Sequence, residues 1–470
     1  MSCDPRPLLA LLAVGALGSS AAAAPIPIPT SQFITPTATP GSTFQPLNPH
    51  LTQLPDFTAG QAVTSVVSPD NRTMLVLTSG YNLNLDSNGN NVAATSNEYV
   101  FVFDISKGAP VQTQVLEVPN TYVGLVFAPD GATFYVTGGV DDDVHRFQLE
   151  GGSWAESGAA IELNNGPGNG ITKGIAPVPA VGFPGIPPFV GAQAAGVAVS
   201  ADATTLAVAN YENDSVSLVS VATGQVRAFD LRPGKSDPSK AGVPGGEFPY
   251  WLAFKGSDRL YVSSLRDREI VVLDVSGAAP AVVARIALKG NPTKMILNRA
   301  QTRLLAASDN SDTVDIIDTA SNQLLGSIDT TSPGEVPKVR RGSSPNSLAL
   351  SPDEKTLYVT NAGTNSIALI KLDDSQSGGR VEGLIPTGWY PNSVSVSTDG
   401  RTLYVVNAKS KTGPSPRQCT DVGPGPYQID ACPASLQNGS ANEYVLQQTK
   451  AGLLTVPVPH GLSLAELTEV

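Results

Sequence analysis

The sequence predicts an all-β protein, a seven-bladed β-propeller made of four-stranded antiparallel blades, on three observations. Gly and Pro supply 45 and 39 of the 470 residues. A mainly helical fold would not tolerate them, because Pro costs about 3 kcal/mol in a helix interior and Gly about 1 kcal/mol. Hydrophobic residues still make up 41% of the chain, which is enough to build a core and argues against disorder. The third observation is a phrase that recurs seven times along the chain.

The recurring phrase consists of a short apolar run, a turn of the Ser-Pro-Asp type and a run of the Thr-Leu-Tyr-Val type. Its best copies are SPDEKTLYVT from Ser351 and STDGRTLYVV from Ser397. Anchored on the apolar residue after the Thr, the copies fall at Met74, Phe134, Leu206, Leu260, Leu304, Leu357 and Leu403. The shortest interval, the 44 residues from Leu260 to Leu304, fits the length of one propeller blade. A β-sandwich, the alternative fold, would not predict a phrase repeated seven times.

One copy indicates how each blade is built. Residues 347–361 have the pattern of two alternating strands around a tight turn, in which Pro352 presets φ and Asp353 suits the next position. Residues 366–372 and 381–387 supply a third and a fourth strand. A single sheet of this kind cannot bury both of its faces, whereas radial stacking of several such sheets does.

The N-terminus predicts export. An apolar run of eleven residues, Leu8 to Gly18, follows Arg6 and precedes the small residues Ser19 to Ala24, which is the layout of a secretory signal peptide. The alternative, a membrane anchor, needs about 20 apolar residues. We therefore expect a periplasmic or secreted protein without a membrane span.

The expected division of the chain is a signal peptide at 1–24, a Pro-rich segment at 25–57, the propeller at 58–459 and a C-terminal tail at 460–470. We expect blade 7 to supply its own last strand from residues 453–459. Residues 43–57 would then run along the outside of the ring or cover one of its ends.

Export also bears on Cys419 and Cys432, which lie in one loop rich in Gly and Pro. An oxidising compartment favours a disulfide between them. Closing a loop of this size would stabilise the protein by about 3 kcal/mol in the chain-entropy model. A metal-binding pair is the alternative, but no His or further Cys lies nearby to complete a zinc site.

The long segments between strands are all expected on one face. In a propeller blade, the loop between the second and third strands shares a face with the connection to the next blade, opposite the Ser-Pro-Asp turns. The segments at these positions are 80–97, 164–193, 232–247, 333–343 and 409–441. Insertions confined to one face often mark a binding face. The alternative is that this face merely tolerates insertions.

Aromatic and basic residues are expected near the mouth of the central channel on this face. They are Tyr122, Tyr211, Tyr250, Trp251, Arg266, Arg268, Lys294, Arg340, Arg341, Trp389 and Tyr390. In a chain with only 15% charged residues, this grouping would suit a small anionic or flat ligand, or a protein partner. The alternative is that Trp251 and Trp389 pack between blades. The net charge of −12 argues against a nucleic-acid partner.

A first candidate metal site lies in the segment 80–97. Asn84, Asp86 and Asn88, followed by Gly89, partly match a calcium-binding loop, in which oxygen ligands recur at alternate positions before a Gly. A solvated loop rich in Asn is the alternative. Calcium is the one cofactor for which the sequence offers a candidate.

A second candidate metal site lies in the expected second-to-third-strand loop of blade 2. Alternation places Asp141, Asp143 and His145 on one side of the chain. These side chains are of the types that bind metals. The alternative is that the carboxylates face water and that His145 is hydrogen-bonded to one of them.

Two runs resemble a known repeat. TLYVTN at 356–361 and TLYVVN at 402–407 resemble the YVTN repeat of bacterial seven-bladed propellers, often described as YncE-like. FITPTATPGSTFQPLNPHL (33–51) and GLIPTGWYPNSVSVS (383–397) resemble a bacterial group in which such a propeller precedes an alkaline-phosphatase-superfamily phosphoesterase domain. Residues 450–470 resemble the exit from the propeller to that domain. The resemblance implies a propeller over nearly all of the mature chain, and a phosphoesterase domain as a partner in cis or in trans.

Two functions follow from these observations. The first is an exported binding or scaffold propeller without catalysis of its own, because the three histidines, His50, His145 and His460, are widely spread and no nucleophile motif is present. The alternative is a propeller hydrolase or lactonase acting at the channel mouth. It would need a carboxylate there as an acid or base. The available carboxylates are Glu212, Asp267, Asp309 and Asp312.

Overall fold

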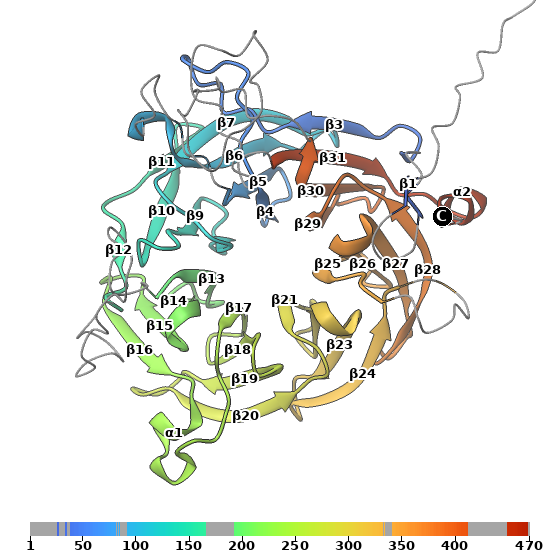
Figure 1. The fold of residues 1–470 in the computed structure, drawn as a ribbon. Coiled ribbons are helices and arrows are strands. Elements are labelled where there is room, and N and C mark those ends of the chain that lie inside the picture. The colour runs from blue at the N-terminus through green and yellow to red at the C-terminus, as the bar shows by residue number, and fades with distance from the viewer. Residues whose placement is uncertain are drawn as a thin grey trace, which may run out of the picture.

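The computed structural model is a seven-bladed propeller of four-stranded antiparallel blades, as the sequence predicts (Figure 1). The structure describes residues 26–27, 33–34, 38–80, 82, 84, 92–165, 192–331, 333, 341–411 and 449–468. The blades follow one another around a central opening in chain order (Figure 1). Outside the ring, β1 (Ile26–Pro27) pairs with β2 (Phe33–Ile34). No helix within these residues is long and apolar enough to cross a membrane.

Each blade runs from an innermost strand to an outermost strand. Blade 1 is β4 (Ala62–Val67), β5 (Thr73–Thr78), β6 (Glu98–Asp104) and β7 (Val111–Val118). Blade 2 is β8 (Leu125–Phe127), β9 (Thr133–Thr137), β10 (Asp143–Glu150) and β11 (Ser153–Glu156), with β12 (Ile161–Glu162) also paired to β10. Blade 3 is β13 (Ala194–Val199), β14 (Thr205–Asn210), β15 (Ser215–Ser220) and β16 (Val226–Asp230). Blade 4 is β17 (Pro249–Lys255), β18 (Arg259–Ser264), β19 (Glu269–Asp274) and β20 (Ala281–Ala287).

The remaining three blades have the same order. Blade 5 is β21 (Pro292–Leu297), β22 (Arg303–Ser308), β23 (Thr313–Asp318) and β24 (Gln323–Asp329). Blade 6 is β25 (Pro345–Leu350), β26 (Thr356–Asn361), β27 (Ser366–Leu372) and β28 (Gly379–Pro386). Blade 7 is β29 (Pro391–Val396), β30 (Thr402–Lys411), β31 (Lys450–Pro457) and β3 (Thr43–Pro46). The short helices are η1 (Ala93–Thr95), η3 (Tyr211–Asn213), α1 (Pro233–Ser236), η4 (Pro238–Lys240), η5 (Asp309–Ser311), η6 (Ala362–Thr364) and α2 (Leu462–Thr468).

A serine and an aspartate hold the turn between the first and second strands in four blades. In blade 6, the Ser351 hydroxyl donates to Asp353 at 2.6 Å and accepts the backbone N–H of Thr356 at 3.0 Å. The same two contacts recur around Ser68, Ser200 and Ser397. The serine hydroxyl also holds the pKa of Asp353 below its usual range. The repeated phrase is therefore a repeated hydrogen-bond pattern, and it places these turns on the face opposite the long loops.

The inner strands of each sheet are buried on both sides because a neighbouring blade covers each face. Leu304 and Leu305 are adjacent in β22 and so point to opposite faces. Leu304 packs in a cluster with Tyr261 of blade 4, and Leu305 packs in a cluster with Leu348 of blade 6. Such strands are continuous apolar runs, which explains why only 15% of the chain is charged.

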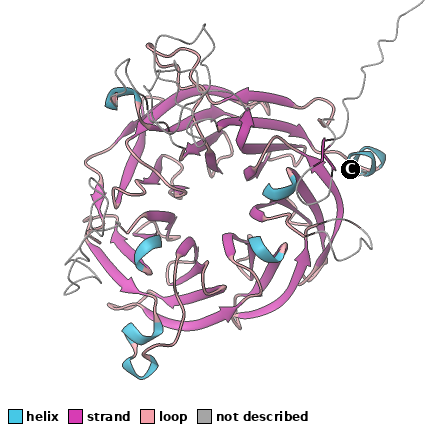
Figure 2. Cartoon of the chain, viewed as in Figure 1, coloured by secondary structure: helices cyan, strands magenta, loops and turns pink. Residues whose placement is uncertain are grey.

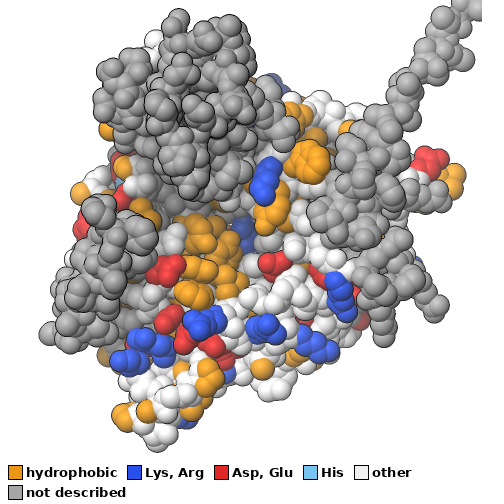
Figure 3. Space-filling model, in the orientation of Figure 1, with side chains coloured by type: hydrophobic (Ala, Val, Ile, Leu, Met, Phe, Trp, Pro, Cys, Tyr) orange, Lys and Arg blue, Asp and Glu red, His pale blue; other side chains and the backbone are white. Residues whose placement is uncertain are grey.

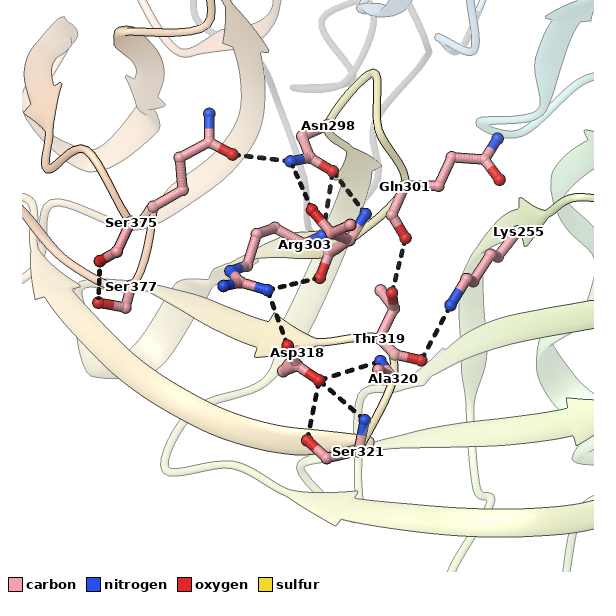
Figure 4. A network of polar contacts seen from close by, with 12 residues as sticks. Lys255, Asn298, Gln301, Arg303, Asp318, Thr319, Ala320, Ser321, Ser375 and Ser377 are labelled. Atoms are coloured by element: carbon pink, nitrogen blue, oxygen red, sulfur yellow. Dashed lines mark hydrogen bonds and ion pairs between the residues drawn. The ribbon is translucent and has the colours of Figure 1, made fainter.

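Polar contacts also join neighbouring blades on the face that carries the short turns (Figure 4). Lys255 of blade 4 donates from Nζ to the backbone carbonyl of Thr319 in blade 5 at 3.1 Å. The hydroxyl of Thr319 donates to the carbonyl of Gln301 at 2.6 Å. The side-chain amide of Asn298 donates to Gln376 of blade 6 at 2.7 Å. This face therefore connects blades 4, 5 and 6 through buried and half-buried hydrogen bonds.

The ring closes through a strand from the N-terminal segment, and the expectation that blade 7 supplies its own last strand is wrong. β31 is the third strand of this blade, and β3 pairs with it as the outermost strand, from Thr43 opposite Thr455 to Pro46 opposite Gly452. Leu47 follows in the core, where its carbonyl accepts the N–H of Ala59 at 2.8 Å. The sequence does not indicate this pairing because β3 is only four residues long and its partner is at the other end of the chain.

The C-terminal residues cover the outer edge of blade 6. The helix α2 packs against β28 and buries Leu464 and Leu467. The hydroxyl of Thr468 accepts the N–H of Leu384 at 2.9 Å and donates to the carbonyl of Leu464 at 2.6 Å. Because β28 is an edge strand, its free N–H groups would otherwise face solvent. The tail that resembles an exit from the propeller is thus docked on it as a helix.

We predict that deleting residues 1–47 destabilises the propeller, because the deletion removes β3 and the buried side chain of Leu47. Truncating one buried Leu side chain alone costs about 2–5 kcal/mol. Urea unfolding should show a free energy of unfolding lower by at least this amount. A matched deletion of residues 1–37 keeps β3 and should leave the stability unchanged. Equal stability of the two deletion variants would contradict closure through β3.

Candidate functional site

We call the face that carries the second-to-third-strand loops and the connections between blades the long-loop face. On this face, short helices that follow the second strands lie around the central opening. The helices η3, η5 and η6 come directly after β14, β22 and β26, and lie around the opening (Figure 2). The connections between blades enter the innermost strands on the same face. The structure therefore brings residues from several blades to one mouth, as the assignment of loops to faces predicts.

Three tyrosines from three blades form one cluster at this mouth. Tyr122 precedes β8, Tyr211 begins η3 and Tyr250 lies at the start of β17. Their ring centroids are 5.8, 6.0 and 6.4 Å apart, and the rings meet edge to face at 67–84°. We call Tyr122, Tyr211 and Tyr250 the tyrosine triad. Phe248 stacks on Tyr211 at 4.9 Å and extends this aromatic wall.

The backbone turns sharply where the chain enters the innermost strands. Phe248 and Tyr390 are the residues directly before Pro249 and Pro391, and they have φ values of 53° and 54°. Positive φ is uncommon for a bulky residue and stores strain. A β-bulge follows in each of these strands. Bulges re-aim side chains next to functional sites, and here they accompany aromatic residues at the mouth.

Lys294 crosses the channel below the aromatic wall. It comes from β21 of blade 5 and is only 5% exposed. Its Nζ donates to the carbonyl of Val63 in blade 1 at 2.6 Å and to the carbonyl of Asn392 in blade 7 at 3.2 Å. The ammonium also lies 5.2 Å from the centroid of the Trp251 ring. Burial lowers the pKa of Lys294 to about 7, because a buried charge loses its hydration.

Two asparagines complete the polar layer around Lys294. The side chain of Asn392 donates to the carbonyl of Ala62 at 2.9 Å, and that of Asn346 donates to Asn392 at 2.9 Å. The sequence analysis did not select either residue. A signal was present, since Asn346 and Asn392 follow Pro345 and Pro391 as Tyr250 follows Pro249. Alignment of the blades on these prolines would have placed both asparagines at the channel.

Two carboxylates flank the tyrosine triad. Burial raises the pKa values of Tyr122 and Tyr211, and the charge of Glu212 adds to both shifts. Burial also raises the pKa values of Tyr250 and Tyr390, and Asp309 adds to both. Asp309 itself is half-buried, and desolvation raises its pKa, against a hydrogen bond from Ser344 that lowers it. Glu212 and Asp309 are thus acidic groups whose charge raises the pKa values of the triad tyrosines and of Tyr390.

The space-filling view shows the mouth as a hollow. Hydrophobic side chains, tyrosine included, fill its centre, and acidic side chains lie on two sides of them (Figure 3). Basic side chains lie further out along the rim, and basic side-chain atoms are also visible within the hollow (Figure 3). Two other cavities lie away from the mouth. One of about 510 Å³ lies between blades 1 and 2 next to Trp154, and one of about 240 Å³ lies between α1 and β20.

The predicted basic residues that the structure describes have different surroundings. Arg266 pairs with Glu247 at 3.1 Å and lies 5.8 Å from the centroid of the Phe248 ring. Arg268 occupies a left-handed turn position with φ of 54°. Arg341 donates to the carbonyl of Ser311 at 3.0 Å. Arg340 lies outside the described residues.

The two predicted tryptophans differ in their surroundings. Trp251 is half-buried, and its ring N–H donates to the carbonyl of Met295 in blade 5 at 3.1 Å. Packing between blades, the alternative considered for Trp251, is therefore seen. Trp389 is 43% exposed. Its neighbour Tyr390 is 38% exposed and lies 4.4 Å from the ammonium of Lys409.

The described part of the first candidate metal site is hydrogen-bonded within its own segment, 80–97. The amide of Asn84 donates to the carbonyl of Thr95, and its backbone N–H donates to Ser96 at 2.7 Å. Asp86 and Asn88 lie outside the described residues. So do Cys419 and Cys432, the two cysteines of the predicted disulfide, and the signal-peptide segment 1–24.

The second candidate metal site forms hydrogen bonds within blade 2. Nδ1 of His145 lies 2.6 Å from Glu156, and its Nε2 lies 3.5 Å from Asp143. The hydrogen bond of His145 is therefore to Glu156, which was not among the carboxylates considered. Asp141 accepts from Asn120 at 2.9 Å. Within the part of the chain that the structure describes, no group of three or more His, Cys, Asp or Glu side chains is arranged to hold a metal ion.

Comparison with known proteins agrees with the fold. Residues 324–414 match a family model described as "Lactonase, 7-bladed beta-propeller". This match runs from β24 to just beyond β30 and includes the two best YVTN-like runs. No curated protein matches the chain.

Several solved structures share the fold at low sequence identity. Hydrazine synthase from Kuenenia stuttgartiensis has a TM-score of 0.52 and 15% identity, over 75% of this chain and 94% of that chain. A provisionally assigned 6-phosphogluconolactonase from Bacteroides uniformis has a TM-score of 0.51 and 16% identity, over 71% and 88%. Virginiamycin B lyase from Staphylococcus aureus has a TM-score of 0.50 and 12% identity, over 88% and 99%. These likenesses concern the fold alone, and none of the three is described as a phosphoesterase, so that association stays an expectation from the resemblance.

We predict that Lys294→Met changes how stability depends on pH. An ordinary lysine in an unfolded chain has a pKa of about 10.4, whereas burial lowers the pKa of Lys294 to about 7. Between these values the unfolded chain binds more protons than the folded chain, so the wild-type protein gains stability as the pH rises. Relative to Lys294→Met, the wild-type free energy of unfolding should rise by roughly 1 kcal/mol per pH unit between about pH 7.5 and 9.5.

Urea unfolding at three pH values measures this difference. Lys371→Met, a substitution of an exposed lysine on β27, is the matched control and should give a pH profile parallel to the wild type. A parallel profile for Lys294→Met as well would contradict the lowered pKa.

Proposed function

We propose that the protein binds a small ligand at the mouth of its central channel and performs no chemistry on it. The observation that carries this proposal is the tyrosine triad, which gathers residues of blades 2, 3 and 4 at the start of their innermost strands and in η3. Aromatic side chains on a rigid scaffold offer large contact area at a low cost in conformational entropy. Lys294 and its two carbonyl partners close the space beneath the ligand.

The surroundings of the mouth favour binding over catalysis. The chain has three histidines, and none belongs to the mouth, since His50 follows β3, His145 lies in β10 and His460 precedes α2. Asp312 and Asp267, two carboxylates considered for catalysis, accept backbone N–H groups of Gly342 and Glu247. These contacts assign both carboxylates to the support of loops.

We also propose that the protein acts outside the cytoplasm and that a phosphoesterase domain is a candidate partner. The support for export is the signal-like segment 1–24, and the support for the partner is the resemblance of residues 33–51 and 450–470.

The binding proposal predicts that small flat molecules contact the tyrosine triad. Saturation-transfer NMR with indole and with phenol should show both probes bound. Tyr211→Ala should weaken binding by roughly tenfold, because loss of one aromatic contact costs about 1–1.5 kcal/mol. Leu325→Ala, a substitution of an exposed apolar residue on β24, should leave binding unchanged. Equal weakening by both substitutions, or no signal for either probe, would contradict the proposal.

Lactone hydrolysis is the second candidate function, and the match of residues 324–414 to the lactonase propeller model favours it. Of the two carboxylates at the mouth, the half-buried Asp309 would act as the base. It would take a proton from water while the water oxygen attacks the lactone carbonyl. The ring C–O bond would then break, and its oxygen would take up the proton.

This second function predicts measurable ring opening. A pH-stat should record acid release from γ-butyrolactone or glucono-δ-lactone above the buffer rate, and Asp309→Asn should lower the rate by roughly a hundredfold or more, the usual effect of losing a general base. Asp329→Asn, on the same blade but outside the mouth, is the control. A rate that equals the buffer rate would eliminate lactone hydrolysis and leave the binding proposal standing.

A further inference from the structure

We propose that the ligand taken at the channel mouth is a cation: an organic amine or quaternary ammonium compound with a flat group that contacts the tyrosine triad. The inference rests on the proposed binding function and names the chemical class of its ligand. The positive charge of the ligand departs from the sequence-based expectation, in which a grouping of Arg and Lys side chains favours an anionic ligand.

The carboxylates at the mouth are the first support. Glu212 lies in η3 on blade 3, directly after Tyr211, and Asp309 is the first residue of η5 on blade 5. Among the residues that the structure describes, neither carboxylate has a Lys or Arg partner within ion-pair distance. Both side chains therefore leave negative charge on the short helices that lie around the opening (Figure 2). An ammonium group between them would gain from both.

The aromatic rings at the mouth are the second support. Three of them already lie beneath a cation of the protein: Tyr390 with Lys409 at 4.4 Å, Trp251 with Lys294 at 5.2 Å and Phe248 with Arg266 at 5.8 Å. The face of an aromatic ring is electronegative and attracts cations. The tyrosine triad is the part of this wall over which no described cation lies. A ligand cation over the triad would make the same cation–π contact that Lys409, Lys294 and Arg266 make with the neighbouring rings.

Two of the basic groups nearby, Arg266 and Lys294, are engaged elsewhere. Arg266 pairs with Glu247 at 3.1 Å, and Lys294 is fixed to two backbone carbonyls below the mouth. An anionic ligand at the triad would face Glu212 and Asp309, and the Lys409 ammonium lies over Tyr390 and not over the triad. Like charges repel each other, so the two carboxylates select against an anion.

The packing of the triad limits where the cation lies. The three rings touch one another, with centroids 5.8–6.4 Å apart, so an ammonium group does not fit between them. The ligand must therefore lie on the channel side of the rings. Its flat group and its charged group would then both contact the same surface of the tyrosine triad. This geometry favours a primary or quaternary amine on a single aromatic or alicyclic ring.

Three probes of similar shape and different charge test the inference. Benzyltrimethylammonium is the cation, benzyl alcohol is neutral and phenylacetate is the anion. Titration followed by tryptophan fluorescence or calorimetry should give the lowest Kd for benzyltrimethylammonium. Asp309→Asn and Glu212→Gln should each raise that Kd by roughly fivefold to tenfold and leave the Kd of benzyl alcohol unchanged. Asp329→Asn is the matched control and should change neither, and circular dichroism of each variant checks that the fold is kept.

The results of these titrations distinguish an error in the charge of the ligand from an error in the proposed binding function. Equal affinity for the cation and for benzyl alcohol, with weakening by Tyr211→Ala, would overturn the cation class and leave the binding site intact. Preference for phenylacetate would overturn the inference in favour of an anion. Binding of none of the three probes, in a protein that also fails to bind indole and phenol, would overturn both.

Discussion

Closure of the ring is the constraint on which the rest of this structure depends. Each sheet buries both faces only while a blade stands on either side of it, and blade 7 reaches its full width only through β3. The same constraint operates at the centre. Lys294 of blade 5 reaches carbonyls of Val63 in blade 1 and Asn392 in blade 7, and these distances exist only in a closed ring. The geometry of the channel mouth thus depends on a strand pairing at the outer rim.

The two faces of the ring differ in how they use hydrogen bonds. On one face, Ser and Asp side chains hold short turns, and contacts such as Lys255 to Thr319 join the blades. On the other face, the chain enters the innermost strands through left-handed residues, among them Phe248 and Tyr390. Strain of about 1–3 kcal/mol at such a position is tolerated only where the surrounding structure over-determines it. The tightly bonded face therefore supplies the rigidity that lets the opposite face present aromatic rings in a fixed geometry.

The fold was predictable because its signals are local. A turn and the alternation that follows it are encoded within about 15 residues and recur in each blade, with Ser-x-Asp in four of the turns, so the repeat alone indicates the propeller. β3 has no such signal, since four residues without an apolar pattern pair with a strand from the other end of the chain. The tyrosines of the site were predictable for the same reason as the blades, because equivalent positions in a propeller converge on its axis. Asn392 was missed because its position after Pro391 matters only when the blades are superposed.

The charges at the mouth were harder to predict than its rings. A ring at the start of an innermost strand has few directions in which to point, whereas a long basic side chain can reach several partners. Arg266 turns to Glu247, and Lys294 extends across the channel to backbone carbonyls, so neither contributes a free cation where the sequence places it. The shorter side chains of Glu212 and Asp309 stay closer to their backbone positions in η3 and η5. Burial adds to this effect, because a Lys294 with a pKa of about 7 carries only part of its charge near neutrality. A cation bound above it would favour the neutral form further, so ligand charge and lysine ionisation would be coupled through the same narrow channel.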